Sequence, residues 1–259
     1  MGEQLSLQIV DVTQKFGGLT ALNQIRMDVR RGEIIGIIGP NGAGKTTLFN
    51  IITGVYRPSS GRILLEGEDI TGRKPHQITR RGFARTFQNI RLFPRMNVFE
   101  NVQMGMCCHA KANLLDALLS TPAKRRELRE QQLRVNGILE LMGLSEKKYA
   151  MPGSLPYGEQ RKLEIARALA TQPKILLLDE PAAGMNEQET ADLLVTVQKL
   201  RELGITILLI EHDMKFVMNI CERIYVLNYG ELIASGTPEE IQHDEMVIEA
   251  YLGKDVDDE

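Results

Sequence analysis

The chain has 259 residues, of which 43% are hydrophobic and 25% charged, which is typical of a globular protein with a sizeable buried core. Its formal net charge of −3 argues against a nucleic-acid-binding protein, because such proteins usually carry a basic surface. Its three cysteines form neither a disulfide framework nor a zinc-binding spacing, so we expect free thiols in a reducing compartment.

Apolar stretches along the chain are short. The N-terminus lacks the apolar segment of a secretory signal peptide. The longest apolar runs, such as 205–210, fall far below the roughly 20 residues that span a bilayer. We therefore expect any membrane role to depend on partner proteins, and we interpret the acidic end, 255–259, as a solvated tail.

Strands are predicted near the start of the chain. Apolar and polar residues alternate over 5–9 and 25–29, as on half-buried strands. The uninterrupted apolar run 34–38 predicts a buried strand that leads into a loop. A helix is expected over 44–52, and a further strand over 62–66.

The middle of the chain favours helices. Asn97 and Glu100 have the spacing of a capping box at a helix start. A second helix is expected to begin at Thr121-Pro122 and to end near Gly143. Because residues 95–154 show no strand pattern, we predict a helical subdomain there.

Helices and short apolar strands alternate in the last third of the chain. This alternation predicts a parallel sheet covered by helices. Thr237-Pro238-Glu239-Glu240 predicts the start of a short C-terminal helical region. The predicted segments are a helix over 161–170, a strand over 175–178, a helix capped by Asn186 and Glu189 and closed by Gly204, and strands over 205–210 and 223–227.

Residues 39–47, GPNGAGKTT, match the pattern G-x-x-x-x-G-K-[ST]. The glycines let backbone N–H groups surround phosphates, Lys45 brings positive charge to the terminal phosphates, and Thr46 offers a hydroxyl to Mg²⁺. An apolar strand before the motif and a helix after it provide the required context. The predicted nucleotide-binding residues are Gly39, Pro40, Asn41, Gly42, Ala43, Gly44, Lys45, Thr46 and Thr47.

A second motif, ILLLDEP, covers 175–181. Four apolar residues bury a strand, and Asp179 emerges at its carboxyl end, where open α/β sheets bind ligands. There Asp179 can hold Mg²⁺ through water, and Glu180 is placed to orient or deprotonate a water that attacks a γ-phosphate. Alone, this pair would fit a solvated strand end equally well. Together with the phosphate loop, it predicts hydrolysis of a nucleoside triphosphate.

Three further stretches occur in a specific order. RTFQN contains Gln88, SLPYGEQRKLEIARAL covers 154–169, and LLIEHDM contains His212. Each is a weak signal alone, because a lone Gln is usually a surface residue and a lone His is usually structural. With the two motifs above, these stretches make the chain resemble the ATP-binding subunit of an ABC transporter over nearly its whole length.

The resemblance implies an α/β fold, a P-loop NTPase with a RecA-like parallel sheet core, an antiparallel β subdomain and an inserted α-helical subdomain. The ATP-binding core with the β subdomain would comprise 1–94 and 162–240. The helical subdomain with the signature motif would be 95–161, and 241–259 a C-terminal helical extension and acidic tail. In this family two cassettes face head to tail, and each ATP lies between the phosphate loop of one and the signature helix start of the other.

The resemblance also assigns individual residues. Gln88 corresponds to the Q-loop glutamine, and His212 to the switch histidine near the γ-phosphate. Phe16 corresponds to the aromatic that stacks on adenine, although packing in the core would explain it equally well. The implied metal ligands are Thr46, Gln88 and Asp179, and the implied catalytic residues are Glu180, His212 and Lys45. The signature pattern Leu-Ser-Gly-Gly-Gln falls on Leu155, Pro156, Tyr157, Gly158 and Glu159.

Pro156 replaces the serine of the family's signature. Proline suits the first turn of a helix, but it removes a hydroxyl donor to the γ-phosphate, and a hydrogen bond to a charged group contributes about 1.5–3 kcal/mol. Backbone N–H groups near Gly158 still attract an anion. We hypothesise a weakened half-site and two unequal ATP sites, with full backbone compensation as the equal alternative. Asn186 similarly replaces an aspartate of the family's D-loop, 181–186, so contacts between cassettes there are undecided.

Several stretches resemble the LivG-type ATPases of branched-chain amino-acid importers, above all the ending GTPEEI…VIEAYLG. Such ATPases pair with a second, different ABC ATPase on two transmembrane permease subunits that an external substrate-binding protein supplies. A homodimer is the alternative for the isolated chain. The resemblance thus implies ATP and Mg²⁺ as cofactors, no nucleic acid, and a place on the cytoplasmic face of the inner (cell) membrane held through the permeases.

The stretch after Gln88 is expected to transmit force. Its apolar residues lie in an irregular region whose composition fits a groove that receives a helix of a membrane subunit. Val98, Phe99 and Val102 have helical spacing and are expected to face the subdomain's own core. The groove residues predicted here are Ile90, Leu92, Phe93 and Met96.

Other functions remain alternatives at this point. Related importers of urea or amides use similar ATPases. Soluble ABC ATPases that act on DNA or the ribosome typically carry long coiled coils, zinc cysteines or two cassettes, and none of these is found in the sequence. A P-loop GTPase or small-molecule kinase would account for Lys45 and Asp179 but not for the signature stretch or His212.

Overall fold

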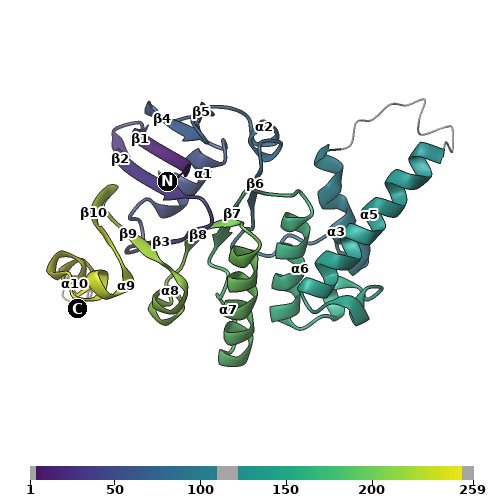
Figure 1. The fold of residues 1–259 in the computed structure, drawn as a ribbon. Coiled ribbons are helices and arrows are strands. Elements are labelled where there is room, and N and C mark those ends of the chain that lie inside the picture. Colours follow the sequence, from purple (N-terminus) through teal and green to yellow (C-terminus); the bar gives the residue numbers. More distant parts are fainter. Residues whose placement is uncertain (1–3, 110–121, 253–259) are drawn as a thin grey trace.

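The computed structural model describes residues 4–109 and 122–252 (Figure 1). One of its two sheets is antiparallel, because β1 pairs in that direction with both β2 and β4. This sheet is the predicted antiparallel β subdomain. Its strands, in spatial order, are β2 (Leu19–Arg30), β1 (Leu5–Phe16), β4 (Ser60–Leu65) and β5 (Glu68–Asp69).

The second sheet forms the centre of the molecule. Neighbouring strands from β9 to β6 are parallel, whereas β10 pairs with β9 in the antiparallel direction at the edge. This arrangement confirms the predicted parallel core. The strands, in spatial order, are β10 (Glu231–Gly236), β9 (Arg223–Asn228), β3 (Ile34–Ile38), β8 (Thr206–Ile210), β7 (Ile175–Asp179) and β6 (Phe83–Arg85).

Both faces of the central sheet are covered, as its uninterrupted apolar strands require. All residues of β3, β7 and β8 are buried. Ile35 and Ile37 of β3 share a core with α1 (Lys45–Ile52) and the antiparallel sheet, whereas Ile34 and Ile38 share one with the helices on the opposite face. Those helices include α7 (Glu187–Glu202) and α8 (Met214–Ile220), which Figure 1 shows on the side away from the antiparallel sheet.

The predicted helical subdomain is observed beside this core (Figure 1). Within the described part of 95–154 there is no strand. The capping box of Asn97 and Glu100 is formed, and Val98 and Val102 are fully buried while Phe99 packs against the same core. The elements are α3 (Val98–Gly105), α5 (Pro122–Leu141), α6 (Tyr157–Leu169) and three short 3₁₀ turns, Met106–His109, Ser145–Lys147 and Pro152–Ser154. Thr121, the expected start of the second helix, lies outside the described residues.

The expected subdomain boundary between residues 161 and 162 falls inside α6, which is continuous. The division of the chain into subdomains at this position therefore remains a prediction.

At the C-terminal end, Thr237 caps α9 (Pro238–Gln242) through the predicted capping box, and α10 (Glu245–Leu252) follows. The helix α2 (Pro75–Thr79), the helix α8 and the strand β10 were not predicted from the sequence. Among the described helices, none combines the length and apolar character needed to cross a membrane.

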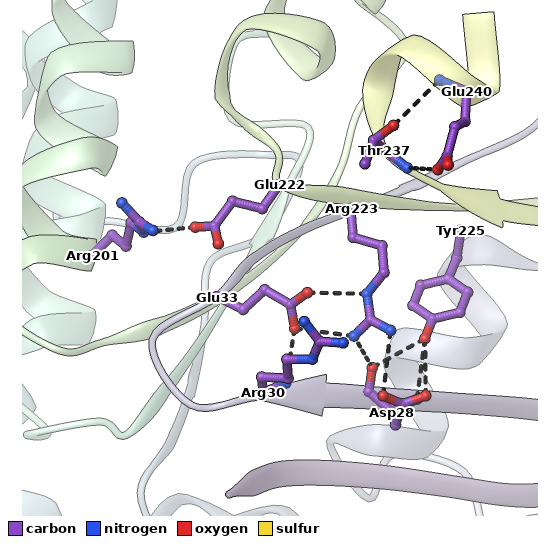
Figure 2. A network of polar contacts seen from close by, with 9 residues as sticks. All are labelled: Asp28, Arg30, Glu33, Arg201, Glu222, Arg223, Tyr225, Thr237 and Glu240. Atoms are coloured by element: carbon purple, nitrogen blue, oxygen red, sulfur yellow. Dashed lines mark hydrogen bonds and ion pairs between the residues drawn. The ribbon is translucent and has the colours of Figure 1, made fainter. Parts of the chain in front are cut away.

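A polar network ties the two sheets together (Figure 2). Arg223 of β9 donates to the backbone oxygen of Asp28 in β2 at 2.7 Å and to both carboxylate oxygens of Glu33 at 3.0 Å. The Tyr225 hydroxyl donates to the same backbone oxygen at 3.0 Å. Because Glu33 is buried, these charge-assisted bonds are the partners its carboxylate needs. The network fixes how the antiparallel sheet sits on the central sheet.

Candidate functional site

The loop between β3 and α1 has a backbone that requires glycine. Gly39 has φ +149, and a Cβ atom there would lie 2.0 Å from the backbone oxygen of Leu227. Gly44 has φ +106, and its Cβ would lie 2.8 Å from the backbone oxygen of Ala21. Side chains are thus excluded where the loop bends tightly against its neighbours. The bend directs the loop into the N-terminus of α1, where free N–H groups and the helix dipole favour anions.

A cavity of about 570 Å³ opens at this loop. Lys45 is buried at its base, and its Nζ donates to the backbone oxygens of Gly39 at 2.5 Å and Pro40 at 2.9 Å. A positive charge is therefore held against the loop in which phosphates would bind. The residues lining the cavity are Phe16, Leu19, Thr20, Ala21, Asn41, Gly42, Ala43, Gly44, Lys45, Thr46, Thr47, Glu180, His212 and Tyr229.

Phe16 lies at the rim of this cavity. Its residue surface is 43% exposed, which rules out a role in the core. Its ring meets the ring of Tyr56 edge to face, with centroids 5.4 Å apart. An exposed aromatic face beside a phosphate-binding loop is suited to stack on a base, and the stacking role of Phe16 remains a prediction.

Glu180 is the centre of a polar cluster at the cavity, which Glu180 and His212 line and Gln88, among the described residues, does not. Its Oε2 accepts a hydrogen bond from Gln88 Nε2 at 2.7 Å, and its Oε1 lies 2.9 Å from His212 Nε2. The backbone of Glu180 has φ +47, a left-handed conformation that costs free energy for a non-glycine residue and is often found at functional sites. The structure thus brings together three predicted residues from three separate loops.

Asp179, the last residue of β7, is held by a residue that the sequence did not single out. The Arg85 guanidinium donates to Asp179 Oδ2 at 2.7 Å, and both side chains are 8% exposed. Arg85 also donates to Asn50 Oδ1 of α1 at 2.7 Å. Since α1 follows the phosphate loop directly, Arg85 fixes the orientation of Asp179 relative to that loop. Asp179 itself is not one of the described residues that line the cavity.

Glu211 is a second residue that sequence reasoning missed. Its buried carboxylate accepts hydrogen bonds from the backbone N–H of Ala182 at 2.6 Å and of His212 at 3.0 Å. Burial raises the pKa of this carboxyl group, and the nearby charge of Glu180 acts in the same direction. Glu211 thus fastens the loop after Glu180 to the loop that carries His212. Its place directly before His212 was the only signal in the sequence.

The signature stretch lies apart from this cavity. Of the residues that the structure describes, none from 155 to 159 lines it. Pro156 is the N-cap of α6, and the helix begins at Tyr157, so the proline precedes the first turn instead of lying within it. Gly158 is buried, and its N–H donates to Glu189 Oε1 at 3.1 Å. In this conformation the Glu189 carboxylate therefore accepts the hydrogen bond from one of the N–H groups expected to bind the γ-phosphate.

Asn186 acts as the N-cap of α7. Its side chain accepts from the N–H of Glu189, and the Glu189 carboxylate accepts in return from the N–H of Asn186. Asparagine is as good an N-cap as aspartate. The replacement of aspartate is thus compatible with the local structure of the D-loop, while its contacts with a second cassette remain a prediction.

A second hollow, of about 700 Å³, lies between α3, α6 and the loop after β6. Leu92 and Phe93 line it as predicted, and the Arg167 guanidinium covers the Phe93 ring at 5.4 Å. Within the described chain, Ile90 and Met96 are not among its lining residues. The groove therefore contains only part of the predicted apolar set.

A strand, a glycine-rich loop and a helix form a phosphate cradle, and a carboxylate, an amide and a histidine from the loops after three other strands of the same sheet lie together beside it. This geometry defines an ATPase of the ATP-binding-cassette class. The family model described as "ABC transporter" matches residues 22–183, and one described as "Branched-chain amino acid ATP-binding cassette transporter" matches 231–257. The chain belongs to the ABC transporter family, and it is an ATPase of that family.

Similar proteins are known over nearly the whole length. The chain is 49% identical to the high-affinity branched-chain amino acid transport ATP-binding protein BraF of Pseudomonas aeruginosa, covering 96% of this chain and 98% of BraF. It is 48% identical to LivG of Escherichia coli strain K12, with the same coverage of both chains. Among solved structures, the ADP conformation of the cassette MJ1267 superposes with a TM-score of 0.84 at 33% identity, covering 96% of this chain and 99% of that chain.

Proposed function

We propose that this chain hydrolyses ATP to drive an importer of branched-chain amino acids. The observation that best supports ATP hydrolysis is the position of the Glu180 carboxylate, which is held between Gln88 and His212 at the cavity of the phosphate loop. The substrate class rests on the similarity to BraF and LivG, whose names state branched-chain amino acid transport. This similarity favours branched-chain amino acids over urea or amides and over a soluble ABC ATPase.

The cavity is proposed to hold ATP. The backbone N–H groups of residues 39–47 and the Lys45 ammonium would bind its phosphates, and Phe16 would stack on the adenine. Thr46, Asp179 and Gln88 offer the hydroxyl, carboxylate and amide oxygens that suit Mg²⁺. Bound there, Mg²⁺ would neutralise negative charge on the terminal phosphates. Arg85 keeps the Asp179 carboxylate in a fixed orientation for this role.

Glu180 is proposed as the residue that orients and deprotonates the attacking water. Its position is set on both sides, since Gln88 and His212 contact different oxygens of one carboxylate. His212 would also donate to the γ-phosphate, where negative charge develops in the transition state. Glu211 supports this arrangement by holding the backbone of His212.

A second cassette is proposed to complete each ATP site. The separation of the signature stretch from the chain's own cavity supports this arrangement, because the N-terminus of α6 can then bind an ATP that a partner holds. The dimeric structure of the cassette MJ0796 superposes on this chain with a TM-score of 0.74 at 25% identity. We infer a different ABC ATPase as the partner in the assembled importer, with a homodimer as the alternative for the isolated chain.

Membrane subunits are proposed to bind at the groove that Leu92 and Phe93 line. Two permeases would hold the chain on the cytoplasmic face of the cell membrane, and an external binding protein would supply the solute. In the proposed cycle, residues 95–161 rotate against 1–94 and 162–240 when ATP bridges the cassettes, while 241–259 remains a C-terminal extension. Hydrolysis then releases the dimer.

Uptake of radiolabelled leucine, urea and acetamide by cells tests this proposal. A strain that lacks the chain should regain leucine uptake with the wild-type chain but not with Glu180→Gln, and uptake of urea and acetamide should not depend on the chain. Restored uptake of urea or acetamide alone would contradict the assignment of the solute. Leucine uptake that is equal with Glu180→Gln would contradict the catalytic role of Glu180.

A further inference from the structure

Two charged side chains are buried in α6 outside the ATP cavity. Arg161 is 0% exposed and Glu164 is 1% exposed, and Arg161 Nη1 lies 2.9 Å from Glu164 Oε2. A buried ion pair is costly unless further hydrogen bonds satisfy its donors and acceptors. Burial also raises the pKa of the Glu164 carboxyl group, against the opposing effect of Arg161. The remaining contacts of this pair therefore indicate what it does.

Those contacts lead to the loop that carries Gln88. Arg161 Nη1 donates a hydrogen bond to the backbone oxygen of Phe87 at 2.6 Å, and Arg161 Nη2 donates one to the backbone oxygen of Gln88 at 2.7 Å. Glu164 Oε1 accepts from the backbone N–H of Arg91 at 3.3 Å. One planar guanidinium thus binds two successive carbonyls and a carboxylate, a geometry that lysine cannot reproduce.

The same guanidinium also reaches the signature stretch. Arg161 Nη2 lies 3.4 Å from the hydroxyl of Tyr157, the first residue of α6. Residues four apart on a helix are neighbours on one face. The N-terminal end of α6, residues 157–161, therefore carries both the expected contact to a partner's ATP and the attachment to the loop of Gln88.

The side chain of Gln88, whose backbone oxygen Arg161 binds, reaches the polar cluster of the cavity through the hydrogen bond between its Nε2 and Glu180 Oε2. We propose that Arg161, braced by Glu164, is a positioning residue that makes the Gln88 loop and the signature helix move as one body. A shift of α6 on the ATP of the second cassette would then move Gln88 relative to Glu180. The coupling of the two ATP sites rests on the proposed function, whereas the attachment itself is a property of this chain.

Amide hydrogen exchange and steady-state ATP turnover test the proposal on the full chain. In Arg161→Met the amides of residues 87–92 should exchange about tenfold faster or more, while α5 and the rest of α6 keep their protection. The kcat for ATP should fall about tenfold, because misplacement of a positioned group affects the chemical step, and the KM for ATP should change less than about twofold. Arg161→Lys should recover only part of both losses.

Lys162→Met is the matched control. Lys162 is the next residue of α6, and its ammonium lies 3.7 Å from Asp192 of α7. This variant should leave exchange at 87–92 and turnover unchanged. Unchanged exchange at 87–92 in Arg161→Met would overturn the proposal, and so would an equal rise across α3, α5 and α6, since that would show only a general loss of stability.

If Arg161→Met does not fold, Arg161→Lys provides the same comparison. Faster exchange confined to 87–92 with a reduced kcat supports the proposal, and wild-type values of both overturn it. Neither readout involves the transported solute or the permeases. A failure of leucine uptake would thus refute the proposed importer and leave the role of Arg161 standing, and the reverse also holds.

Discussion

At the scale of single residues, the Glu180 carboxylate is the group on which turnover should depend most. Gln88 and His212 hold its two oxygens at 2.7 Å and 2.9 Å. Glu180→Gln preserves the size of the side chain but removes the proton acceptor. We expect kcat to fall about 100-fold or more, with ATP binding retained, so ATP-loaded closed dimers should accumulate. Turnover measured by phosphate release, and ATP-dependent mass by light scattering, check this expectation.

Glu187→Gln is a suitable control for that variant, because Glu187 is exposed at the start of α7 and loses the same charge. It should keep wild-type turnover. A Glu180→Gln chain that hydrolyses ATP at the wild-type rate would remove Glu180 from the general-base role.

Pro156 offers a second test at this scale. As the N-cap of α6 it makes no side-chain hydrogen bond, whereas serine would offer a hydroxyl donor to an anion. Because such a bond is worth about 1.5–3 kcal/mol, Pro156→Ser should tighten ATP-driven closure in the assembled complex about tenfold or more. Equilibrium closure measured against ATP concentration checks this. Closure and turnover that both stay at wild-type values would support compensation by the backbone.

The residues of the site were only partly predictable. Lys45, Gln88, Glu180 and His212 lie in local motifs, and the structure brings the last three within hydrogen-bonding distance. Arg85, Arg161 and Glu211 act through contacts with residues that are distant along the chain. No local pattern specifies such contacts, so their partners became visible only in the fold.

At the scale of elements, the turn from β3 into α1 depends on Gly39. Alanine there would combine a φ of +149 with a Cβ 2.0 Å from a backbone oxygen. Gly39→Ala should therefore lower the free energy of unfolding by about 1–3 kcal/mol or more and weaken ATP binding. Denaturant titration and nucleotide binding measure the two effects. Gly32→Ala is a control, since φ is +74 there but a Cβ would meet no atom within 4 Å. Equal stability loss in both variants would contradict the steric argument.

The groove beside α3 and α6 provides a prediction about docking. Phe93 is 43% exposed and lies under the Arg167 guanidinium. Leu92→Ala with Phe93→Ala should weaken binding to the permeases about tenfold or more, because both side chains would be buried by the docked helix. Co-purification with the permeases measures binding. Met246→Ala, at an exposed site on α10, should have no effect, and unchanged binding of the double variant would refute the docking site.

Among the elements, periodicity predicted the long or fully buried ones. The apolar runs of β3, β7 and β8 and the capping boxes of α3, α7 and α9 were readable because each has a local cause. The strand β10 was missed, since its residues are exposed or half-buried and it owes its position to pairing with β9. The helix α8 spans only 7 residues, too few for a clear apolar pattern, although the Asp213 cap was a usable signal.

At the scale of the whole molecule, the two parts of the site expected to contact one ATP lie in separate regions of the chain. The phosphate cradle and Glu180 share a cavity, while the signature stretch starts a helix outside it. Arg161 and the Gln88 loop connect the two regions. The sequence implied this division only through a family resemblance, because no local pattern states which parts of a site belong to a second chain.

The most direct test of this account is ATP turnover per chain as a function of protein concentration, with the molecular mass recorded by light scattering on the same samples. We predict that turnover per chain falls towards zero on dilution to monomers and is restored by a second cassette. Constant turnover per chain at dilutions where only monomer mass is present would contradict the claim that the site is shared between two chains.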